Sequence, residues 1–248
     1  MSSTQDALLE RERQFHNERF AGETRVAQEK YYWAIRDCDR DLREMVHAAA
    51  AGGRVLEYGC ATGGHAIELA RRAARVDGID ISDVAIGQAR ERAAALGLCN
   101  ASFAVGDAHA TGYDENTFDL VFGSGIIHHL DTERSLREIH RILKPGGVAV
   151  FKEPLGSNIA INLYRSLTPS ARTEDEHPLR PVDKRLADQV FDSVTWRFYG
   201  LATLATVPLQ ASRLGPPAYR AAAGIDRILA AIPGMRWQLW YALLTLRK

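Results

Sequence analysis

A chain of 248 residues with 31 basic and 31 acidic side chains has no net formal charge, so its electrostatics give no reason to expect a nucleic acid partner. An apolar content of 46% is ordinary for a soluble globular protein, and a chain of this length can bury one substantial core. No run of about 18 apolar residues is present, so we expect no transmembrane segment.

Its three cysteines, Cys38, Cys60 and Cys99, are scattered without the spacing of metal ligands or of a disulfide framework. The first residues, "MSSTQDALLERERQ", lack the basic and apolar segments of a signal peptide. We therefore expect a cytoplasmic protein.

Residues 1–50 are polar and favour helices, so we expect a helical N-terminal cap on a domain of residues 51–248. Short β-type runs then alternate with helical stretches. The runs are "RVLEYG", "RVDGIDI", "ASFAVGD", "FDLVFGSG" and "GVAVFKE". Helices are expected to start near Gly63, after Ser82 as an N-cap, and at Asp131. This alternation predicts an α/β, doubly wound fold whose parallel sheet is covered by helices on both faces.

The alternation ends after Glu153, and residues 154–236 are expected to contain insertions for substrate recognition or a lid. A helical turn is predicted around residues 159–164 and a helix at about residues 182–190. β-like runs follow at "VTWRFYG" and at the closing "WQLWYALLTLRK".

The stretch of residues 204–236 is predicted to form an amphipathic helix. Ile225, Leu229 and Ile232 fall on one face of it, whereas Arg220 and Asp226 lie off that face. The apolar face must cover the acceptor pocket, a second subunit or a membrane surface. Of these we expect the pocket, because the stretch lies beside the strand ends where ligands bind.

The glycine-rich stretch "VLEYGCATGG", residues 55–64, follows the first β-type run and predicts a ligand-binding turn. A phosphate-binding P-loop is excluded because no lysine follows Gly63 or Gly64. The dinucleotide pattern G-x-G-x-x-G is absent, and Glu57 would repel a pyrophosphate. The remaining candidate is S-adenosylmethionine, a cofactor without phosphate and with a positive group.

The segment "LEYGCATG" resembles the first motif of the class I (Rossmann-like) S-adenosylmethionine-dependent methyltransferases, in the broad small-molecule group. Ala61 stands where the middle glycine is usual in that family. "GIDIS", "VGDAH", "FDLVFGSGIIHHL" and "LKPGGVAVF" resemble the later motifs in their order. The resemblance covers about residues 54–153. It implies a seven-stranded sheet ending in an antiparallel hairpin of "VTWRFYG" and "WQLWYALLTLRK", with an N-terminal cap and a C-terminal insertion.

Two acids that end β-type runs are the main candidates for holding the cofactor. Asp80 can accept hydrogen bonds from a ribose diol, and its alternative is an acid at the start of a helix. Asp107, by the resemblance, accepts from the adenine amino group, and its alternative is a turn aspartate. The other expected cofactor-binding residues are Glu57, Gly59, Cys60, Ala61, Gly63, Ile81, Ala108 and Gly123.

The catalytic candidates follow the next two β-type runs. The resemblance implies that His128 and His129 face the substrate pocket. One of them, with His129 favoured, is a candidate general base or substrate clamp, and packing on the sheet edge is the alternative. Glu153 is a candidate for orienting the acceptor, and its alternative is a salt bridge with Lys152 or an arginine.

Two further residues, Tyr32 and His177, are expected to contact the substrate. Core packing is the alternative for Tyr32. The cluster of Glu174, Asp175, Glu176 and His177 contains metal-ligating types, but adjacent acids in a loop usually form a solvated surface. We therefore expect no metal.

We expect transfer of a methyl group from S-adenosylmethionine to a small or medium organic acceptor by in-line displacement, at oxygen rather than nitrogen or carbon. Two alternatives stay open. The chain could bind the cofactor and catalyse a cyclisation or rearrangement, or it could be a non-catalytic partner subunit. A small-molecule acceptor is the expected partner, and a homodimer is left open.

Overall fold

The computed structural model describes residues 3–21, 29–166 and 176–248, and the structural statements below concern these parts of the chain. Within them, no helix combines the length and the apolar character that crossing a membrane requires.

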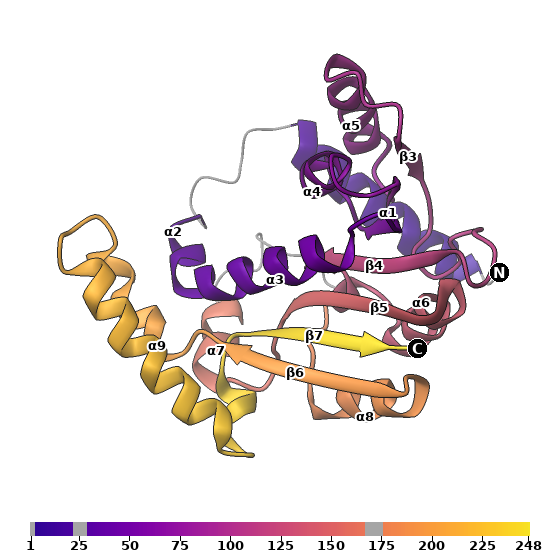
Figure 1. The fold of residues 1–248 in the computed structure, drawn as a ribbon. Helices are drawn as coiled ribbons and strands as arrows, with labels where there is room; N and C mark the ends of the chain where they lie inside the picture. The colour runs from indigo at the N-terminus through magenta and orange to yellow at the C-terminus, as the bar shows by residue number, and fades with distance from the viewer. Residues whose placement is uncertain (1–2, 22–28, 167–175) are drawn as a thin grey trace.

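Seven strands form one sheet in the order β3-β2-β1-β4-β5-β7-β6 (Figure 1). The strands are β1 (Arg54–Tyr58), β2 (Arg75–Asp80), β3 (Ala101–Val105), β4 (Phe118–Ser124), β5 (Leu143–Pro154), β6 (Ser193–Tyr199) and β7 (Tyr241–Arg247). Strands β1 to β5 are parallel, whereas β7 runs antiparallel to both β5 and β6. The predicted sheet and its antiparallel end are confirmed. The last strand is shorter than predicted, because a 3-10 turn, η5 (Met235–Gln238), precedes it.

Helices cover both faces of the sheet, as predicted. One face packs against α3 (Arg36–Ala49), α4 (Gly64–Leu69) and α5 (Asp83–Ala95). The other face packs against α6 (Thr132–Ile142) and α8 (Pro181–Val190). The side chains of Ser82 and Asp131 cap α5 and α6 by accepting from backbone N–H groups at 3.1 and 3.0 Å. The predicted N-cap at Ser82 and the predicted helix start at Asp131 are therefore confirmed.

The N-terminal region is helical, and its first two helices contribute residues to the cavity at the carboxyl ends of the strands. It consists of α1 (Ser3–Ala21), α2 (Glu29–Tyr32), the 3-10 turn η1 (Trp33–Ile35) and α3. Helix α1 packs on α5, where Asn17 accepts a hydrogen bond from the Ser82 hydroxyl at 2.6 Å and donates to Asp83 at 2.8 Å. These contacts fix α1 near the end of β2.

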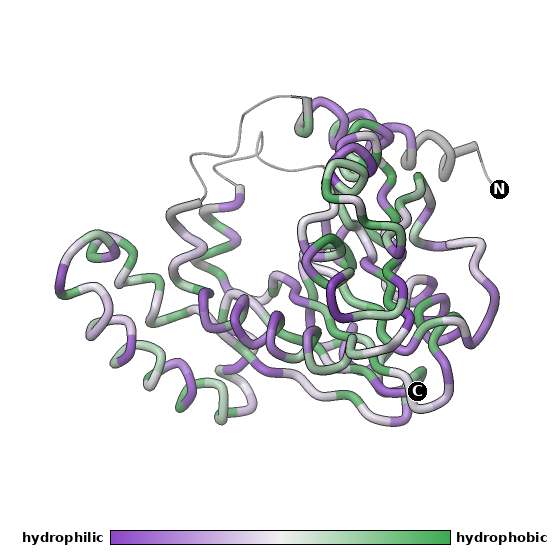
Figure 2. Tube along the Cα trace, turned by 45° about the horizontal axis from the view of Figure 1, so that its top comes forward, coloured by the Kyte–Doolittle hydropathy of each residue, from purple (hydrophilic) through white to green (hydrophobic). Residues whose placement is uncertain are grey.

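After β5 the chain forms a short helix, α7 (Ile159–Ser166), before α8 and β6. Between β6 and β7 it forms a 3-10 helix, η4 (Ala202–Leu209), and then α9 (Gly215–Ala231), which packs on η4 and β6 (Figure 1). Hydrophobic and hydrophilic residues alternate along α9 in Figure 2.

The predicted apolar face of this helix was wrong. Ile225 is 51% exposed and Ile232 is 46% exposed. The buried side of α9 consists of Tyr219, Ala222, Ala223 and Asp226. Small side chains allow the helix to approach β6 and η4 closely, and the acid forms hydrogen bonds there.

Asp226 is 4% exposed and holds the N-terminus of η4. Its carboxylate accepts from the backbone N–H groups of Leu201, Ala202 and Thr203 at 3.1, 2.6 and 3.3 Å. The Thr203 hydroxyl donates to the same carboxylate at 2.9 Å. These N–H groups are among those that a helix start leaves without a backbone partner.

Replacing Asp226 with alanine should lower the free energy of unfolding by about 2–4 kcal/mol, because buried N–H groups lose a charged acceptor. Urea denaturation of the wild type and the variant measures this. The matched control is Asp188→Ala, which removes an exposed ion pair with Lys184 and should cost about 0.5 kcal/mol or less. Equal losses in the two variants would show that Asp226 has no capping role.

Candidate active site

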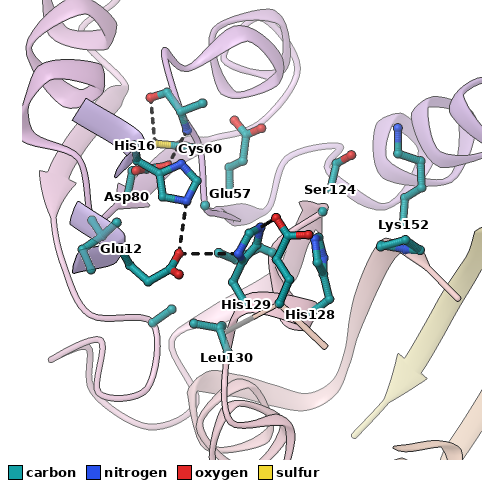
Figure 3. A pocket seen from close by; sticks show the side chains of 18 of the residues that line it. Glu12, His16, Glu57, Cys60, Asp80, Ser124, His128, His129, Leu130 and Lys152 are labelled. Atoms are coloured by element: carbon teal, nitrogen blue, oxygen red, sulfur yellow. Dashed lines mark hydrogen bonds and ion pairs between the residues drawn. The ribbon is translucent and has the colours of Figure 1, made fainter. Parts of the chain in front are cut away.

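A cavity of about 650 Å³ opens at the carboxyl ends of the parallel strands (Figure 3). It lies where β1 and β4 are neighbours, because the chain proceeds from β1 towards one edge of the sheet and from β4 towards the other. Ligands of open α/β sheets bind at such a switch point. Helix α1 contributes Glu12, His16 and Phe20 to the wall.

The turn after β1 brings the main chain to this cavity. Gly59, Ala61 and Gly63 all have positive φ angles, of 72°, 47° and 73°. A Cβ at Gly63 would lie 2.8 Å from the Phe103 ring, so only glycine fits there. Ala61 adopts a backbone conformation that costs an L-residue about 1–2 kcal/mol. Its N–H donates to the Asp80 carboxylate at 2.8 Å, which stabilises the turn in this strained form.

Asp80 therefore has a structural role and also lines the cavity. One carboxylate oxygen accepts from Ala61 N–H, and the other accepts from Ser82 N–H at 2.9 Å. The acid thus connects the glycine turn to the start of α5. Each carboxylate oxygen has a second acceptor position, so both remain able to accept from a ligand.

Asp107 has one carboxylate oxygen bound and the other unsatisfied. Oδ1 accepts from the His109 backbone N–H and from its Nδ1–H, both at 2.8 Å. The ring carries its proton on Nδ1 because Nε2 accepts from Asp131 N–H at 2.9 Å. The hydrogen bond from His109 lowers the pKa of Asp107. Oδ2 is buried and has no hydrogen-bond partner among the described residues, so the carboxylate offers an acceptor to a ligand N–H.

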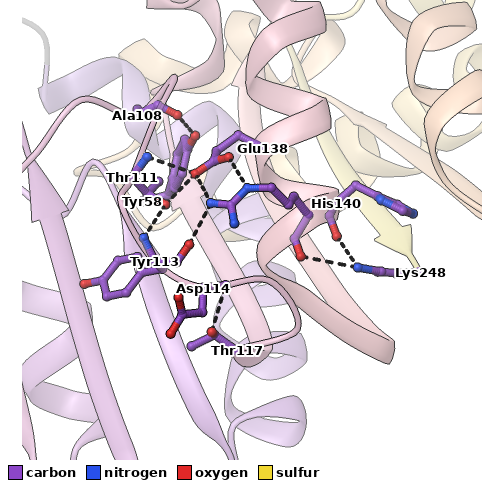
Figure 4. A network of polar contacts seen from close by, with 10 residues as sticks. Tyr58, Ala108, Thr111, Tyr113, Asp114, Thr117, Glu138, His140 and Lys248 are labelled. Carbon is purple, nitrogen blue, oxygen red and sulfur yellow. Dashed lines mark hydrogen bonds and ion pairs between the residues drawn. The ribbon is translucent and has the colours of Figure 1, made fainter.

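A network of polar contacts holds the loop that carries Asp107 (Figure 4). The Tyr58 hydroxyl donates to the carbonyl of Ala108. Glu138 of α6 accepts from Thr111 N–H at 2.9 Å and from the Thr111 hydroxyl at 2.6 Å. Arg141 pairs with Glu138 at 2.8 Å and donates to the Tyr113 carbonyl at 2.7 Å. The loop is therefore positioned by the sheet and by α6 before any ligand binds.

Glu57, at the carboxyl end of β1, is 5% exposed and lines the cavity. Its Oε2 accepts from Ala66 N–H at 2.8 Å. Burial, with a smaller contribution from the charge of Asp80, raises the pKa of Glu57 to about 8. A cation beside this carboxyl group would favour its ionised form.

His128 and Glu153 form a hydrogen-bonded pair beside the cavity. His128 Nδ1 lies 2.8 Å from Glu153 Oε2, and Glu153 also accepts from the N–H groups of Ile126 and Ile127 at 3.0 Å. Burial opposes ionisation of Glu153, but the hydrogen bonds from His128 and these backbone groups lower its pKa overall. An ionised acid bound to one ring nitrogen fixes the orientation of the imidazole.

His129 lies beside His128, with ring centroids 4.2 Å apart. It also lines the cavity, between Glu12 of α1 and Glu176. Burial lowers the pKa of His129, against the opposing effect of Glu12. The ring is therefore held mainly in its neutral form near pH 7.

Most of the residues expected at the cofactor do line the cavity: Glu57, Gly59, Cys60, Ala61, Asp80, Ile81, Asp107 and Ala108. Gly63 and Gly123 do not. Gly63 shapes the turn, and a Cβ at Gly123 would lie 2.6 Å from the Tyr58 carbonyl oxygen, inside the sheet. The residues after Gly123, from Ser124 to Ile126, line the cavity in its place.

The structure places two residues expected on the substrate side away from the cavity wall. Glu153 is 0% exposed and does not line the cavity, so it cannot orient an acceptor directly. Of the alternative partners, Lys152 pairs with Asp39 instead, and Glu153 pairs with His128. His177 is absent from the wall and donates its backbone N–H to the His128 carbonyl at 2.8 Å, whereas the adjacent Glu176 lines the cavity.

Tyr32 lines the cavity, together with residues that the sequence did not indicate. The latter include Glu12, His16, Arg165, Trp240 and Tyr241. They come from segments far from the motifs, and only the helical spacing of Glu12 and His16 is a local signal. Glu174 and Asp175, which we considered as metal ligands, lie outside the described residues.

The wall fits S-adenosylmethionine, the cofactor that the sequence indicates. Asp107 offers a buried, unsatisfied oxygen to an amino group. The turn after β1 exposes main chain with no phosphate-binding lysine beside it. Glu57 and Asp80 supply negative charge for a cationic cofactor.

Comparisons with known proteins agree with this geometry. Residues 55–147 match the family described as "Methyltransferase domain". Norajmaline N-methyltransferase of Rauvolfia serpentina is 32% identical over 143 residues, which cover 56% of this chain and 44% of that protein. Sterol 24-C-methyltransferase of Aspergillus fumigatus is 35% identical over 123 residues, which cover 48% of this chain and 32% of that protein. The chain therefore spans less than half of the length of both curated relatives.

A solved structure has the same fold over almost the whole chain. Geranyl diphosphate C-methyltransferase from Streptomyces coelicolor A3(2), in complex with Mg²⁺, geranyl diphosphate and S-adenosyl-L-homocysteine, aligns with a TM-score of 0.66 and 14% identity. The alignment covers 97% of each chain. Residues 55–147 thus match a methyltransferase domain, and the chain has the fold of a solved methyltransferase that binds S-adenosyl-L-homocysteine.

Proposed function

We propose that this chain transfers the methyl group of S-adenosylmethionine to a hydroxyl oxygen of a small or medium organic acceptor. The proposal rests on the hydrogen-bonded pair of His128 and Glu153. His128 lines the same cavity as the glycine turn after β1 and the acids at the ends of the strands. Methylation of a hydroxyl requires that a proton be removed, and a histidine held by an ionised acid is suited to remove it.

The proposed contacts of the cofactor are with three acids of the cavity wall. Asp107 accepts from the adenine amino group through its unsatisfied Oδ2. Asp80 accepts from the ribose hydroxyls, and Glu57 faces the cationic methionine end. When bound, S-adenosylmethionine supplies a methyl group activated by a positively charged sulfur, with a neutral leaving group.

His128 is the proposed general base. Its Nδ1–H donates to Glu153, which leaves Nε2 to accept the proton of the acceptor hydroxyl. The negative charge of Glu153 then stabilises the imidazolium that forms. The sequence favoured His129 for this role, but of the two histidines His128 lies closer to its acid: its Nδ1 is 2.8 Å from Glu153, whereas His129 Nδ1 is 3.5 Å from Glu12.

Aromatic side chains indicate the kind of acceptor. Phe20, Tyr31, Tyr32, Trp240 and Tyr241 line the cavity together. Aromatic walls bind an apolar or ring-shaped body and leave a few polar groups to orient it. We therefore propose an acceptor whose hydroxyl is attached to a ring or hydrocarbon body.

Cofactor affinity should rise with pH because of Glu57. Its pKa of about 8 means that the carboxyl group is protonated near neutral pH, and a bound cation expels that proton. Binding that releases a proton becomes tighter as pH rises, by up to about tenfold per unit. Calorimetry with S-adenosylmethionine between about pH 6 and about pH 7.5 measures this change. This range lies below the usual pKa of an α-amino group, so the cofactor keeps its own charge. The affinity of Glu57→Gln for the cofactor should be independent of pH. An equal pH dependence in the wild type and Glu57→Gln would exclude proton release by Glu57.

His128→Ala should lower turnover by about 10²- to 10⁴-fold and leave cofactor affinity little changed. Glu153→Gln should lower turnover as well, because the ring loses its ionised partner. The measurement is S-adenosylhomocysteine release with a panel of phenols and ring-bearing alcohols. The control His47→Ala alters a partly buried histidine outside the cavity wall that pairs with Glu68 at 3.2 Å.

Two outcomes would contradict the proposed function. Equal turnover in the wild type and His128→Ala would remove the general base. Acceptor conversion without S-adenosylhomocysteine would instead indicate a cyclisation or rearrangement.

A further inference from the structure

Three side chains that could bind a metal ion converge on the α1 side of the cavity. Glu12 and His16 are four residues apart and therefore lie on the same face of α1. His129 belongs to the 3-10 turn η2 (Ile127–His129) after β4. Figure 3 shows the Glu12 carboxylate between the two imidazole rings. One ligand atom from each residue lies within 4.8 Å of the others.

The distances in this cluster suit a shared ion better than direct hydrogen bonds. Glu12 Oε2 lies 3.5 Å from His16 Nε2 and 3.5 Å from His129 Nδ1. Hydrogen bonds between such groups are about 2.7–3.2 Å long. Two ligands bound at about 2.0–2.1 Å around a tetrahedral ion lie about 3.4 Å apart. His129 Nδ1 is buried and has no hydrogen-bond partner among the described residues.

The other nitrogen of His129 lies at ion-pair distance from a second carboxylate. His129 Nε2 lies 3.8 Å from Glu176 Oε1. Histidines that bind a metal through one nitrogen commonly direct the other towards a carboxylate, which orients the ring. Both nitrogens of His129 are then used, which agrees with His128 being the proton acceptor.

We propose that Glu12, His16 and His129 form a binding site for one divalent first-row transition metal ion, with Zn²⁺ as the ion that suits the donor set. Two imidazoles and one carboxylate are a common set for zinc and related ions. Three protein ligands leave further coordination positions open. All three residues line the cavity, so an acceptor oxygen or a water molecule can occupy an open position.

A second group of residues competes for the same histidine. His128, His129 and Glu176 also bring ligand atoms within 4.8 Å of one another. That group would use the nitrogen of His129 that faces Glu176, and it would draw His128 into the coordination. We favour the first group because it leaves the His128–Glu153 hydrogen bond and the proposed base intact.

The test is zinc binding to the full chain after removal of metals, measured by competition with a chromophoric chelator. Every protein carries Cys99→Ser, because Cys99 is an exposed free thiol. We expect one zinc ion per chain. Glu12→Gln and His16→Ala should each weaken binding by about 100-fold or more, and Glu176→Gln by about tenfold through its effect on the ring. The matched control is His47→Ala, which removes a histidine–glutamate pair outside the cavity wall and should leave binding unchanged.

Substitution by Co²⁺ gives a second readout that does not depend on activity. A site with two imidazoles should show visible absorption bands that change in His16→Ala, while a thermal melt without metal shows that this variant is folded. No binding by the wild type, or equal binding by the wild type and Glu12→Gln, would overturn the proposal. Loss of binding in Glu176→Gln but not in His16→Ala would also overturn it, in favour of the second group. None of these outcomes depends on methyl transfer.

Discussion

Hydrogen bonds from backbone N–H groups to carboxylates at the ends of the strands hold the cavity in shape. Glu57, at the end of β1, binds the N-terminal part of α4. Asp80, at the end of β2, binds both the glycine turn and the start of α5. Glu153 of β5 binds the segment that follows β4. Each acid therefore fixes a segment that follows its own or a neighbouring strand, and the wall is organised before a ligand arrives.

The same arrangement determines which ligands the cavity accepts. Burial, with a smaller contribution from the charge of Asp80, raises the pKa of Glu57 to about 8 and makes its ionised form costly. A cation lowers that cost, whereas a phosphate would increase it. The Asp80 carboxylate accepts from Ala61 N–H and so maintains the strained turn. The same carboxylate supplies negative charge to the cavity, so Asp80 determines both the shape of the turn and part of the charge of the site.

The central part of the fold could be predicted from the sequence because its signals are local. Apolar runs, the Ser82 and Asp131 caps and the glycine turn each act within a few residues. The other parts depend on contacts between distant segments. The buried face of α9 is determined by Asp226, which caps a helix from another part of the chain. Likewise, His129 acquires its partner Glu12 only when α1 packs beside α5.

The most direct test of this account is calorimetry of S-adenosylhomocysteine binding to the wild type, Asp80→Asn, Asp107→Asn and the control Asp114→Asn. Asp114 is exposed and lies outside the cavity wall. We expect one molecule to bind per chain, and Asp80→Asn and Asp107→Asn each to lose about 1–3 kcal/mol of binding free energy. Asp114→Asn should bind as the wild type does. Equal affinity in all four proteins, or no binding by the wild type, would contradict the assignment of the cavity to this cofactor.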